Sequence, residues 1–480
     1  MKVVLVQPRG SNWIPGHEDV SVIANRMAPL GLLSLASSLV QDGHEVTVHD
    51  ALGPFAPPTL EANLDQILSH EPDMVGFTAT TSSFLDAAEM ARQIKDRRPS
   101  TMTVAGGVFV SSVGPALLAR FAGIDGMVLG EGELTLRDLA AGRPPESIPG
   151  LAVRRSGAPP AIAARAPIPD LDSLPFPAYR LLPGFPARYH LPLFNTPAAP
   201  GATMVTSRGC PYRCTFCDRS VYKKTYRFHS AAYVHEHLAH LARDFGVRHV
   251  NIYDDLFTFD RQRILDICDR IERKPLGLTF NCAVRVNHID RDILSRLRAA
   301  GAWMISIGVE SGDPDLLRRH KPGVRLEEVR ATVDLIHRAG LKVKGLFMAG
   351  LPGETPETME RTTRFILSLD LDDLNVARFT PFHGAPLWPR IPEEGTFTED
   401  WRLMNCNNFV FVPHGFESRE ALERAYARLL KTFYCNRAWR RRFVRRLWTC
   451  RHSLWIFLRH LPAMARVRRQ VDRTLRSEPG

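Results

Sequence analysis

The sequence predicts an α/β protein with two parallel-sheet domains and a basic, helical C-terminal tail. Three observations support this fold class. Short apolar runs alternate with amphipathic stretches over residues 1–140, and the alternation returns after a proline-rich interval over residues 201–390. The third observation is that residues 436–480 contain thirteen arginines, which predicts the basic tail. Near-continuous apolar strands separated by helices indicate parallel sheets covered on both faces.

The first domain is expected over residues 1–140 as a flavodoxin-like, doubly wound sheet. Its predicted strands are 2–6, 45–49, 74–78, 101–105 and 126–129, and its predicted helices are 30–41, 60–68, 84–95 and 115–121. Ligands of such sheets bind beyond the carboxyl ends of the strands. Small, hydroxyl and acidic residues stand there, namely Thr80, Ser82, Gly106, Gly107, Gly130, Glu131 and Gly132. They would let a large ligand approach the backbone, although ordinary turn glycines are an equal alternative.

A proline-rich connector is expected over residues 141–200, which hold fourteen of the 36 prolines. The second domain, residues 201–390, repeats strand and helix six times. Its predicted strands lie near 204–207, 250–253, 278–284, 304–309, 343–349 and 374–379. Six such units without a reversed hairpin predict a partial (β/α)6 barrel with its chemistry at the strand C-termini.

Three cysteines follow the first barrel strand, in Gly209-Cys210-Pro211-Tyr212-Arg213-Cys214-Thr215-Phe216-Cys217. Their spacings of four and three let one loop direct all three thiols to one metal centre. Structural zinc normally takes four ligands, and no fourth cysteine follows in this loop; His229 is the nearest alternative donor. Thiolates suit iron–sulfur clusters, and three of them leave one iron of a cubane open. Zinc and buried structural thiols remain the alternatives.

The pattern Cys-x-x-x-Cys-x-aromatic-Cys at the mouth of a partial barrel resembles the radical S-adenosylmethionine (SAM) enzymes. The resemblance implies that Cys210, Cys214 and Cys217 hold a four-iron, four-sulfur cluster whose open iron binds SAM. Further SAM contacts implied by the matching motifs are Phe216, Asp254, Arg285, Glu310, Gly350 and Gly353. A salt bridge or a plain turn is the alternative for each of the latter five. No catalytic residue is assigned beyond these cofactor ligands.

A doubly wound domain ahead of this barrel, with the connector motif Leu-Pro-Phe-Pro at 174–177, resembles the cobalamin-binding radical SAM enzymes. No Asp-x-His-x-x-Gly motif follows the first strand, so a histidine ligand to cobalt is not expected. The resemblance implies that the strand-end residues named above for the first domain, Thr80 to Gly132, contact cobalamin. It also implies methylation of an unactivated carbon through a 5′-deoxyadenosyl radical and methylcobalamin. The alternatives are an oxidative cyclase or ring-rearranging enzyme on a tetrapyrrole-type substrate, and a non-catalytic sensor.

The net charge of +11 lies entirely in residues 436–480, because residues 1–435 balance at 49 basic and 49 acidic side chains. A nucleic-acid partner is therefore not expected. Basic helices with Trp, Phe and Leu often lie on anionic membranes, and a helix docked on the barrel is the equal alternative. Residues 391–480 are expected to form a substrate-side region followed by this tail.

The remaining expectations concern location and partners. No signal peptide or membrane span is evident, and eight cysteines without regular pairing favour a cytoplasmic protein. The expected partners are a small-molecule, lipid-like or tetrapyrrole substrate and an electron donor such as flavodoxin or ferredoxin.

Overall fold

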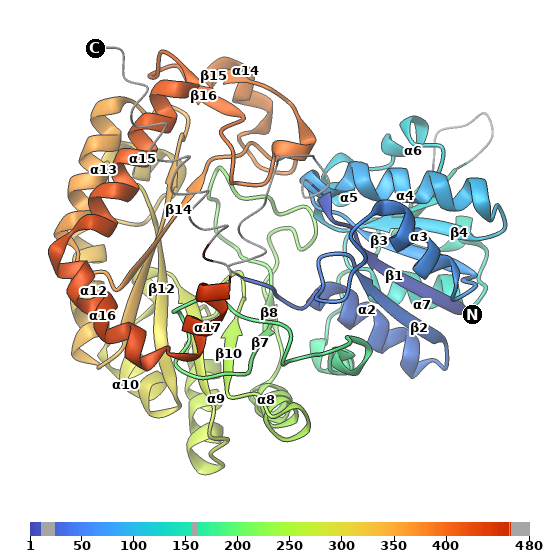
Figure 1. Cartoon of the computed structure of the whole chain (residues 1–480), viewed down its shortest axis with the longest axis horizontal. Helices are drawn as coiled ribbons and strands as arrows, with labels where there is room; N and C mark the ends of the chain where they lie inside the picture. The colour runs from blue at the N-terminus through green and yellow to red at the C-terminus, as the bar shows by residue number, and fades with distance from the viewer. Residues whose placement is uncertain (11–24, 155–161, 460, 462–480) are drawn as a thin grey trace.

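Two six-stranded sheets organise the chain and lie side by side in the computed structural model (Figure 1). The structure describes residues 1–10, 25–154, 162–459 and 461. The first sheet occupies the N-terminal unit and the second forms the wall of a half-barrel. Both predicted parallel sheets, and with them the predicted fold class, are thereby confirmed.

The N-terminal sheet has the strand order β2-β1-β3-β4-β5-β6. Its parallel strands are β1 (Lys2–Gln7), β2 (Glu45–Asp50), β3 (Met74–Thr78), β4 (Met102–Gly106) and β5 (Gly126–Val128). The first five strands thus follow the flavodoxin order 2-1-3-4-5. A sixth strand, β6 (Leu151–Val153), pairs antiparallel with β5 and belongs to the segment predicted as connector. All three of its residues are buried, so closing the sheet edge hides them from water.

Helices cover both faces of this sheet. They are α2 (Leu30–Gln41), α3 (Leu60–Leu68), α4 (Phe84–Arg97), α5 (Val108–Val113), α6 (Leu117–Arg120) and α7 (Glu133–Ala140). One apolar cluster joins α2 and α7 to the sheet, and another joins α3 and α4 to its opposite face. The single helix expected near 115–121 is shorter, and Gly114, with φ of +83°, separates it from α5.

The half-barrel sheet has the order β14-β13-β12-β11-β10-β7, with every neighbouring pair parallel. The strands are β7 (Gly201–Met204), β10 (His249–Ile252), β11 (Thr279–Val284), β12 (Ala302–Glu310), β13 (Lys342–Ala349) and β14 (Asp373–Arg378). The covering helices are α8 (Ala231–Phe245), α9 (Arg261–Arg273), α10 (Arg291–Ala299), α11 (Pro314–His320), α12 (Leu326–Arg338) and α13 (Pro356–Ser368). The predicted partial (β/α)6 barrel is confirmed, and α11 is an addition.

The first barrel strand ends earlier than expected. After β7 the chain leaves the sheet, and β8 (Ser207–Arg208) pairs antiparallel with β9 (Arg227–Phe228). This two-residue ribbon closes the base of the loop that carries the three cysteines. The serine and aspartate caps at Ser230, Asp260 and Asp290 accept hydrogen bonds from the first turns of α8, α9 and α10, which fixes where those helices begin.

The C-terminal region connects the two units. It contains α14 (Ile391–Glu394), β15 (Gly395–Phe397), β16 (Phe411–Pro413), α15 (Arg419–Cys435), α16 (Arg437–Thr449) and α17 (His452–Arg459). Trp401 packs its ring against Phe84 and Phe109 of the N-terminal unit, and Arg402 pairs with Asp86 at 2.8 Å. Among the described residues, no helix combines the length and apolar character needed to cross a bilayer.

Candidate active site

A cavity of about 580 Å³ lies between the carboxyl ends of the two sheets. Its lining combines glycine-rich loops of the N-terminal sheet, the cysteine loop and the ends of barrel strands. The predicted site residues that line it are Gly106, Gly107, Gly130, Glu131, Gly132, Cys210, Cys214, Phe216, Cys217, Arg285 and Glu310. The structure therefore brings together residues that the sequence separates by up to two hundred positions.

The backbone conformation of Gly209 and one hydrogen bond from its amide hold the base of the cysteine loop, residues 209–226. The φ of +87° at Gly209 suits glycine, and a Cβ there would collide with the carbonyl oxygen of Thr225. Its amide donates to Oδ2 of Asp255 at 3.0 Å, so the end of β10 fixes the start of the loop. Cys210, Cys214 and Cys217 then face the same cavity.

The three thiols are partly buried. Burial raises the pKa of Cys210, and burial together with the charges of Cys214, Asp255 and Cys210 raises that of Cys217 to about 12. Among the described residues, no three His, Cys, Asp or Glu side chains converge on a single ion. Thiolates suit iron–sulfur clusters, in which each one binds its own iron.

The alternative ligands lie elsewhere. Cys268 and Cys282 are fully buried in the barrel wall and do not line the cavity. The ring of His229 stacks on Tyr233 at 3.9 Å between centroids, and its Nδ1 lies 3.3 Å from Asp172. These placements leave the loop thiols as the donor set that faces the cavity.

Two charged side chains from barrel strands face the same cavity. The guanidinium of Arg285 lies 3.8 Å from the centre of the Tyr212 ring, a cation–π contact that fixes its orientation. Oε1 of Glu310 accepts a hydrogen bond of 2.8 Å from Nζ of Lys321, and Glu310 itself has a left-handed φ of +73°. A guanidinium and a carboxylate at fixed positions suit the carboxylate and ammonium of an amino-acid ligand.

Asp254 lies behind the cavity wall, and its neighbour Asp255 lines the cavity instead. The buried carboxylate of Asp254 accepts hydrogen bonds from the hydroxyls of Thr206 and Ser207 at 2.6 and 2.7 Å, so it secures the turn between β7 and β8. The sequence pair Asp254-Asp255 marked the right strand end. The choice between its members depends on which side chain points inward, which residue order alone leaves undetermined.

The glycine-rich loop after β13 is also outside the cavity lining. Gly350 and Gly353 have φ of +84° and +85°, so the loop needs glycine for its own turns. A Cβ on Gly350 would lie 2.9 Å from the ring of Phe409, which packs against the loop. Thr80 and Ser82 likewise lie outside the lining, in a 3₁₀ turn where Thr80 Oγ1 is 3.1 Å from Ser83 Oγ.

The N-terminal part of the cavity is a glycine-walled opening that continues into an apolar slot. Gly107 needs its φ of +103°, and a Cβ there would lie 2.7 Å from the carbonyl oxygen of Ala79. Gly130 is open, since a Cβ would meet nothing closer than an oxygen at 3.9 Å. The slot lies among β1, β3, β4, β5, α2 and α7 and is lined by Leu5, Leu32, Leu35, Gly76, Val104, Val128 and Leu136. Open glycine positions beside apolar side chains leave room for a large ligand to approach the backbone.

Histidine is absent from the described residues that line this cavity. His49, on β2, hydrogen-bonds Asn63 at 2.7 Å and is buried away from the opening.

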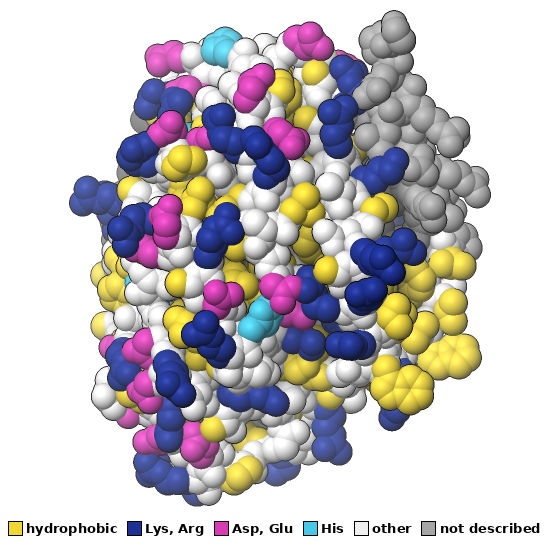
Figure 2. Space-filling view, turned by 90° about the vertical axis from the view of Figure 1, so that its left-hand side faces the viewer, with side chains coloured by type: hydrophobic (Ala, Val, Ile, Leu, Met, Phe, Trp, Pro, Cys, Tyr) yellow, Lys and Arg dark blue, Asp and Glu magenta, His cyan; other side chains and the backbone are white. Residues whose placement is uncertain are grey.

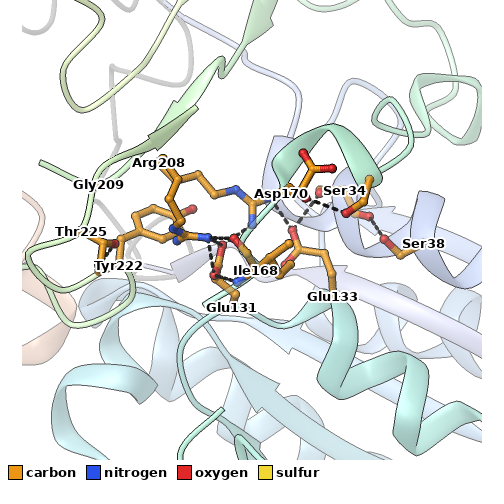
Figure 3. A network of polar contacts seen from close by, with 12 residues as sticks. Ser34, Ser38, Glu131, Glu133, Ile168, Asp170, Arg208, Gly209, Tyr222 and Thr225 are labelled. Carbon is orange, nitrogen blue, oxygen red and sulfur yellow. Dashed lines mark hydrogen bonds and ion pairs between the residues drawn. The ribbon is translucent and has the colours of Figure 1, made fainter. Parts of the chain in front are cut away.

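Charged residues join the two units beside the cavity, and Figure 3 shows Arg208 of the barrel side directed at Glu131 and Glu133. Arg208 donates to Oε1 of Glu131 and to Oε1 of Glu133, both at 2.6 Å, and Arg227 lies 2.9 Å from Oε2 of Glu131. Burial opposes the charge of Glu133, yet the guanidinium of Arg208 outweighs it and holds the pKa of Glu133 below its ordinary value. Neither arginine was predicted as a site residue, because Arg208 and Arg227 are distant in the sequence from their acidic partners.

Comparisons with known proteins agree with this arrangement. Residues 204–366 match the model of the radical SAM superfamily, and residues 17–140 match that of the B12 binding domain. An uncharacterized methyltransferase of Pyrococcus horikoshii is 31% identical over 436 residues, which cover 89% of this chain and 92% of the relative. The chain belongs to the cobalamin-binding radical SAM enzymes.

Two further similar proteins are a cyclase and a methyltransferase of known structure. The anaerobic magnesium-protoporphyrin IX monomethyl ester cyclase of Rubrivivax gelatinosus is 26% identical over 453 residues, covering 91% of this chain and 78% of the cyclase. The solved structure of the radical SAM methyltransferase TsrM from Kitasatospora setae has a TM-score of 0.63 and 21% identity, covering 83% and 79% of the two chains. This structural likeness confirms the two-unit fold.

Proposed function

We propose that this radical SAM enzyme methylates an unactivated carbon atom with cobalamin as the methyl carrier. One observation supports it above the others: a single cavity is bounded by the three thiols on the barrel side and by the open Gly130 on the N-terminal side. The bound cofactors would supply a 5′-deoxyadenosyl radical and a transferable methyl group. The protein's part is to hold both groups at fixed positions in one enclosed space.

The residues divide this work by their chemistry. Cys210, Cys214 and Cys217 would hold the cluster, and Phe216 would contact the adenine from within the same loop. Arg285, which contacts the ring of Tyr212, would hold the carboxylate of SAM. Glu310, which accepts a hydrogen bond from Lys321, would hold the ammonium group. Asp255 joins this list on its position, while Asp254, Gly350 and Gly353 would act by shaping the strand ends behind it.

The test is anaerobic reconstitution with iron, sulfide and hydroxocobalamin, followed by dithionite and SAM. We expect a bound cluster, a bound corrinoid and release of 5′-deoxyadenosine. Failure of the wild-type chain to bind any corrinoid would contradict the proposal. Absence of SAM cleavage despite a full cluster would instead favour a non-catalytic sensor.

An oxidative cyclase is the second candidate, favoured by the similarity to the magnesium-protoporphyrin cyclase. Both candidates use the same cavity, so product mass distinguishes them. Incubation with tetrapyrrole and isoprenoid-lipid extracts should yield a product heavier by one methylene unit if the enzyme methylates. Loss of hydrogen or gain of oxygen would indicate cyclisation. The proposed substrate is lipid-like or a tetrapyrrole, the latter supported by the similarity to the cyclase, and a flavodoxin or ferredoxin is the proposed electron donor.

Residues 436–480 are proposed to contact an anionic membrane from a cytoplasmic location, which the eight unpaired cysteines favour. The inner face of α16 packs on the barrel: Trp439 Nε1 and Arg446 Nη1 donate to the carbonyl oxygen of Asp372 at 3.1 and 3.0 Å. The inner face of α16 therefore corresponds to the alternative in which the basic helix docks on the barrel. Residues 460 and 462–480 lie outside the described residues.

The outer face of α16 and α17 is the one proposed to meet lipid. Trp448 and Trp455 are 79% and 80% exposed, and Val444 and Leu458 are also exposed. Five exposed arginines surround them without an ion-pair partner among the described residues, namely Arg437, Arg440, Arg441, Arg445 and Arg451. Figure 2 shows this face at its right-hand edge, where hydrophobic side chains protrude beside basic ones. Exposed tryptophan among unpaired cations suits the interface of an anionic bilayer.

Vesicle co-sedimentation tests this contact. The full chain should sediment with vesicles that contain phosphatidylserine and stay in solution with phosphatidylcholine alone. Replacing Trp448 and Trp455 by serine should abolish sedimentation, whereas replacing the exposed Phe55 of the N-terminal unit should not. Equal sedimentation of the double variant would contradict the proposal, as would tight binding to RNA instead of vesicles.

A further inference from the structure

The two ends of the cysteine loop carry arginines that lie side by side. Arg208 ends β8 immediately before the loop, and Arg227 begins β9 immediately after it. The two residues are paired in the antiparallel register of this short ribbon. Any group that binds both arginines therefore holds both ends of the loop that presents Cys210, Cys214 and Cys217.

Glu131 is such a group. Its Oε1 accepts from Arg208 at 2.6 Å (Figure 3). Its Oε2 lies 2.9 Å from Arg227, so one carboxylate bridges the two ends. The second guanidinium nitrogen of Arg208 donates to Glu133 at 2.6 Å. The side chains of all four residues are at most 14% exposed. Within the described residues, Nε and Nη2 of Arg227 have no partner, so Glu131 is the carboxylate that balances its charge.

Further hydrogen bonds hold both carboxylates in place. Glu131 accepts one of 2.9 Å from the amide of Ile168 in the connector, and Glu133 accepts one of 2.9 Å from Ser34 on α2 of the N-terminal unit. Glu131 also lies between Gly130 and Gly132, the glycines at the cavity opening. The glycine-walled opening of the cavity and the base of the cysteine loop are thus connected through the carboxylate of Glu131.

We propose that Glu131 is a positioning residue that sets the location of the cluster relative to the corrinoid, by clamping Arg208 and Arg227. This differs from the direct cobalamin contact that the sequence suggested for Glu131, and it rests on the binding of both cofactors proposed above. Its physical basis is that removal of one partner would leave an uncompensated buried charge, which is strongly unfavourable and would displace the groups that hold the loop. Reactions between two held groups are sensitive to displacements of about 1 Å.

Electron paramagnetic resonance provides the test, because a reduced cluster and cob(II)alamin each carry one unpaired spin. The full chain is reconstituted with cluster and hydroxocobalamin, reduced, and the magnetic coupling between the two spins is recorded. We expect a defined coupling in the wild type and a broadened or shifted coupling in Glu131→Gln. Iron content and corrinoid stoichiometry should stay at wild-type values. Glu146→Gln, an exposed glutamate of the same unit, is the matched control.

Each outcome has a distinct meaning. An unchanged coupling in Glu131→Gln would overturn the inference. Loss of corrinoid with an unaltered cluster signal would also overturn it, and would make Glu131 a corrinoid contact. If Glu131→Gln does not fold, Arg227→Lys decides by the same measurement, since lysine keeps the charge without the planar fork. A wild type that lacks either spin signal would refute the proposed function rather than the clamp.

Discussion

The carboxyl group of Glu354 yields a quantitative prediction about stability. It is fully buried under the loop after β13, where it accepts a hydrogen bond from the amide of Gly350. Its Oε1 has no hydrogen-bond partner among the described residues. Burial raises the pKa of Glu354 from 4.5 to about 8, because the ionised form would lose its hydration and face no cation. The folded protein therefore holds this group largely neutral at neutral pH.

The sign of the pH effect follows from this shift. Below pH 4.5 Glu354 is protonated in both the folded and the unfolded chain and does not affect the free energy of unfolding. As the pH rises, the unfolded chain ionises first, and the free energy of unfolding falls until the pH passes about 8. At about 1.4 kcal/mol for each pKa unit, we expect a loss of roughly 3 to 4 kcal/mol between pH 5 and pH 8.

Glu354→Gln removes this loss, because glutamine stays neutral and keeps an acceptor for the Gly350 amide. Urea unfolding followed by tryptophan fluorescence at pH 5 and pH 8 measures the effect. The variant should gain roughly 3 to 4 kcal/mol relative to wild type between the two pH values. Any fixed packing difference cancels in this comparison. Glu360→Gln, at an exposed position of α13, should show no such gain.

A pH-independent difference between Glu354→Gln and wild type would refute the reasoning. It would mean that the folded protein holds the ionised carboxylate, and hence that a cation or ordered water satisfies Oε1. The result also bears on the site, because the same carboxyl group fixes the amide of Gly350 in the loop behind the proposed SAM contacts.

Three further predictions concern single residues. Cys214→Ala should lose nearly all of the cluster absorbance near 400 nm that is expected of a thiolate-bound iron–sulfur cluster, and SAM cleavage with it. Cys435→Ala, at an exposed position, should keep both. Retained SAM cleavage in Cys214→Ala would contradict ligation of the cluster by this thiol. Gly107→Ala should destabilise the protein by about 1 to 3 kcal/mol in thermal or urea unfolding, since its Cβ would crowd Ala79 at positive φ, and a neutral effect would show that the turn relaxes. Trp439→Ala should lower the free energy of unfolding by about 3 to 5 kcal/mol, because the packing of the ring and its hydrogen bond to Asp372 are lost. A neutral effect would show that α16 does not dock on the barrel in solution.

Much of the architecture could be predicted because it depends on local patterns. Alternating apolar runs predicted both parallel sheets. The cysteine loop was predictable for the same reason, since its spacing lies within nine residues. The strand β6 was not predicted, because three residues in a proline-rich segment carry no periodicity of their own. They become a strand only because β5 offers an unpaired edge.

Residue roles at the site divide along the same line. The sequence by itself determined the chemistry available: three thiols, glycine-rich strand ends and a charge excess confined to the tail. Only the tertiary structure decided that Asp255 rather than Asp254 faces the cavity, and that Glu131 binds Arg208 and Arg227. Periodicity and spacing act along the chain, within a turn or a strand. The partner of a buried charge is chosen by how two separate sheets pack, and that choice exists only once both have folded.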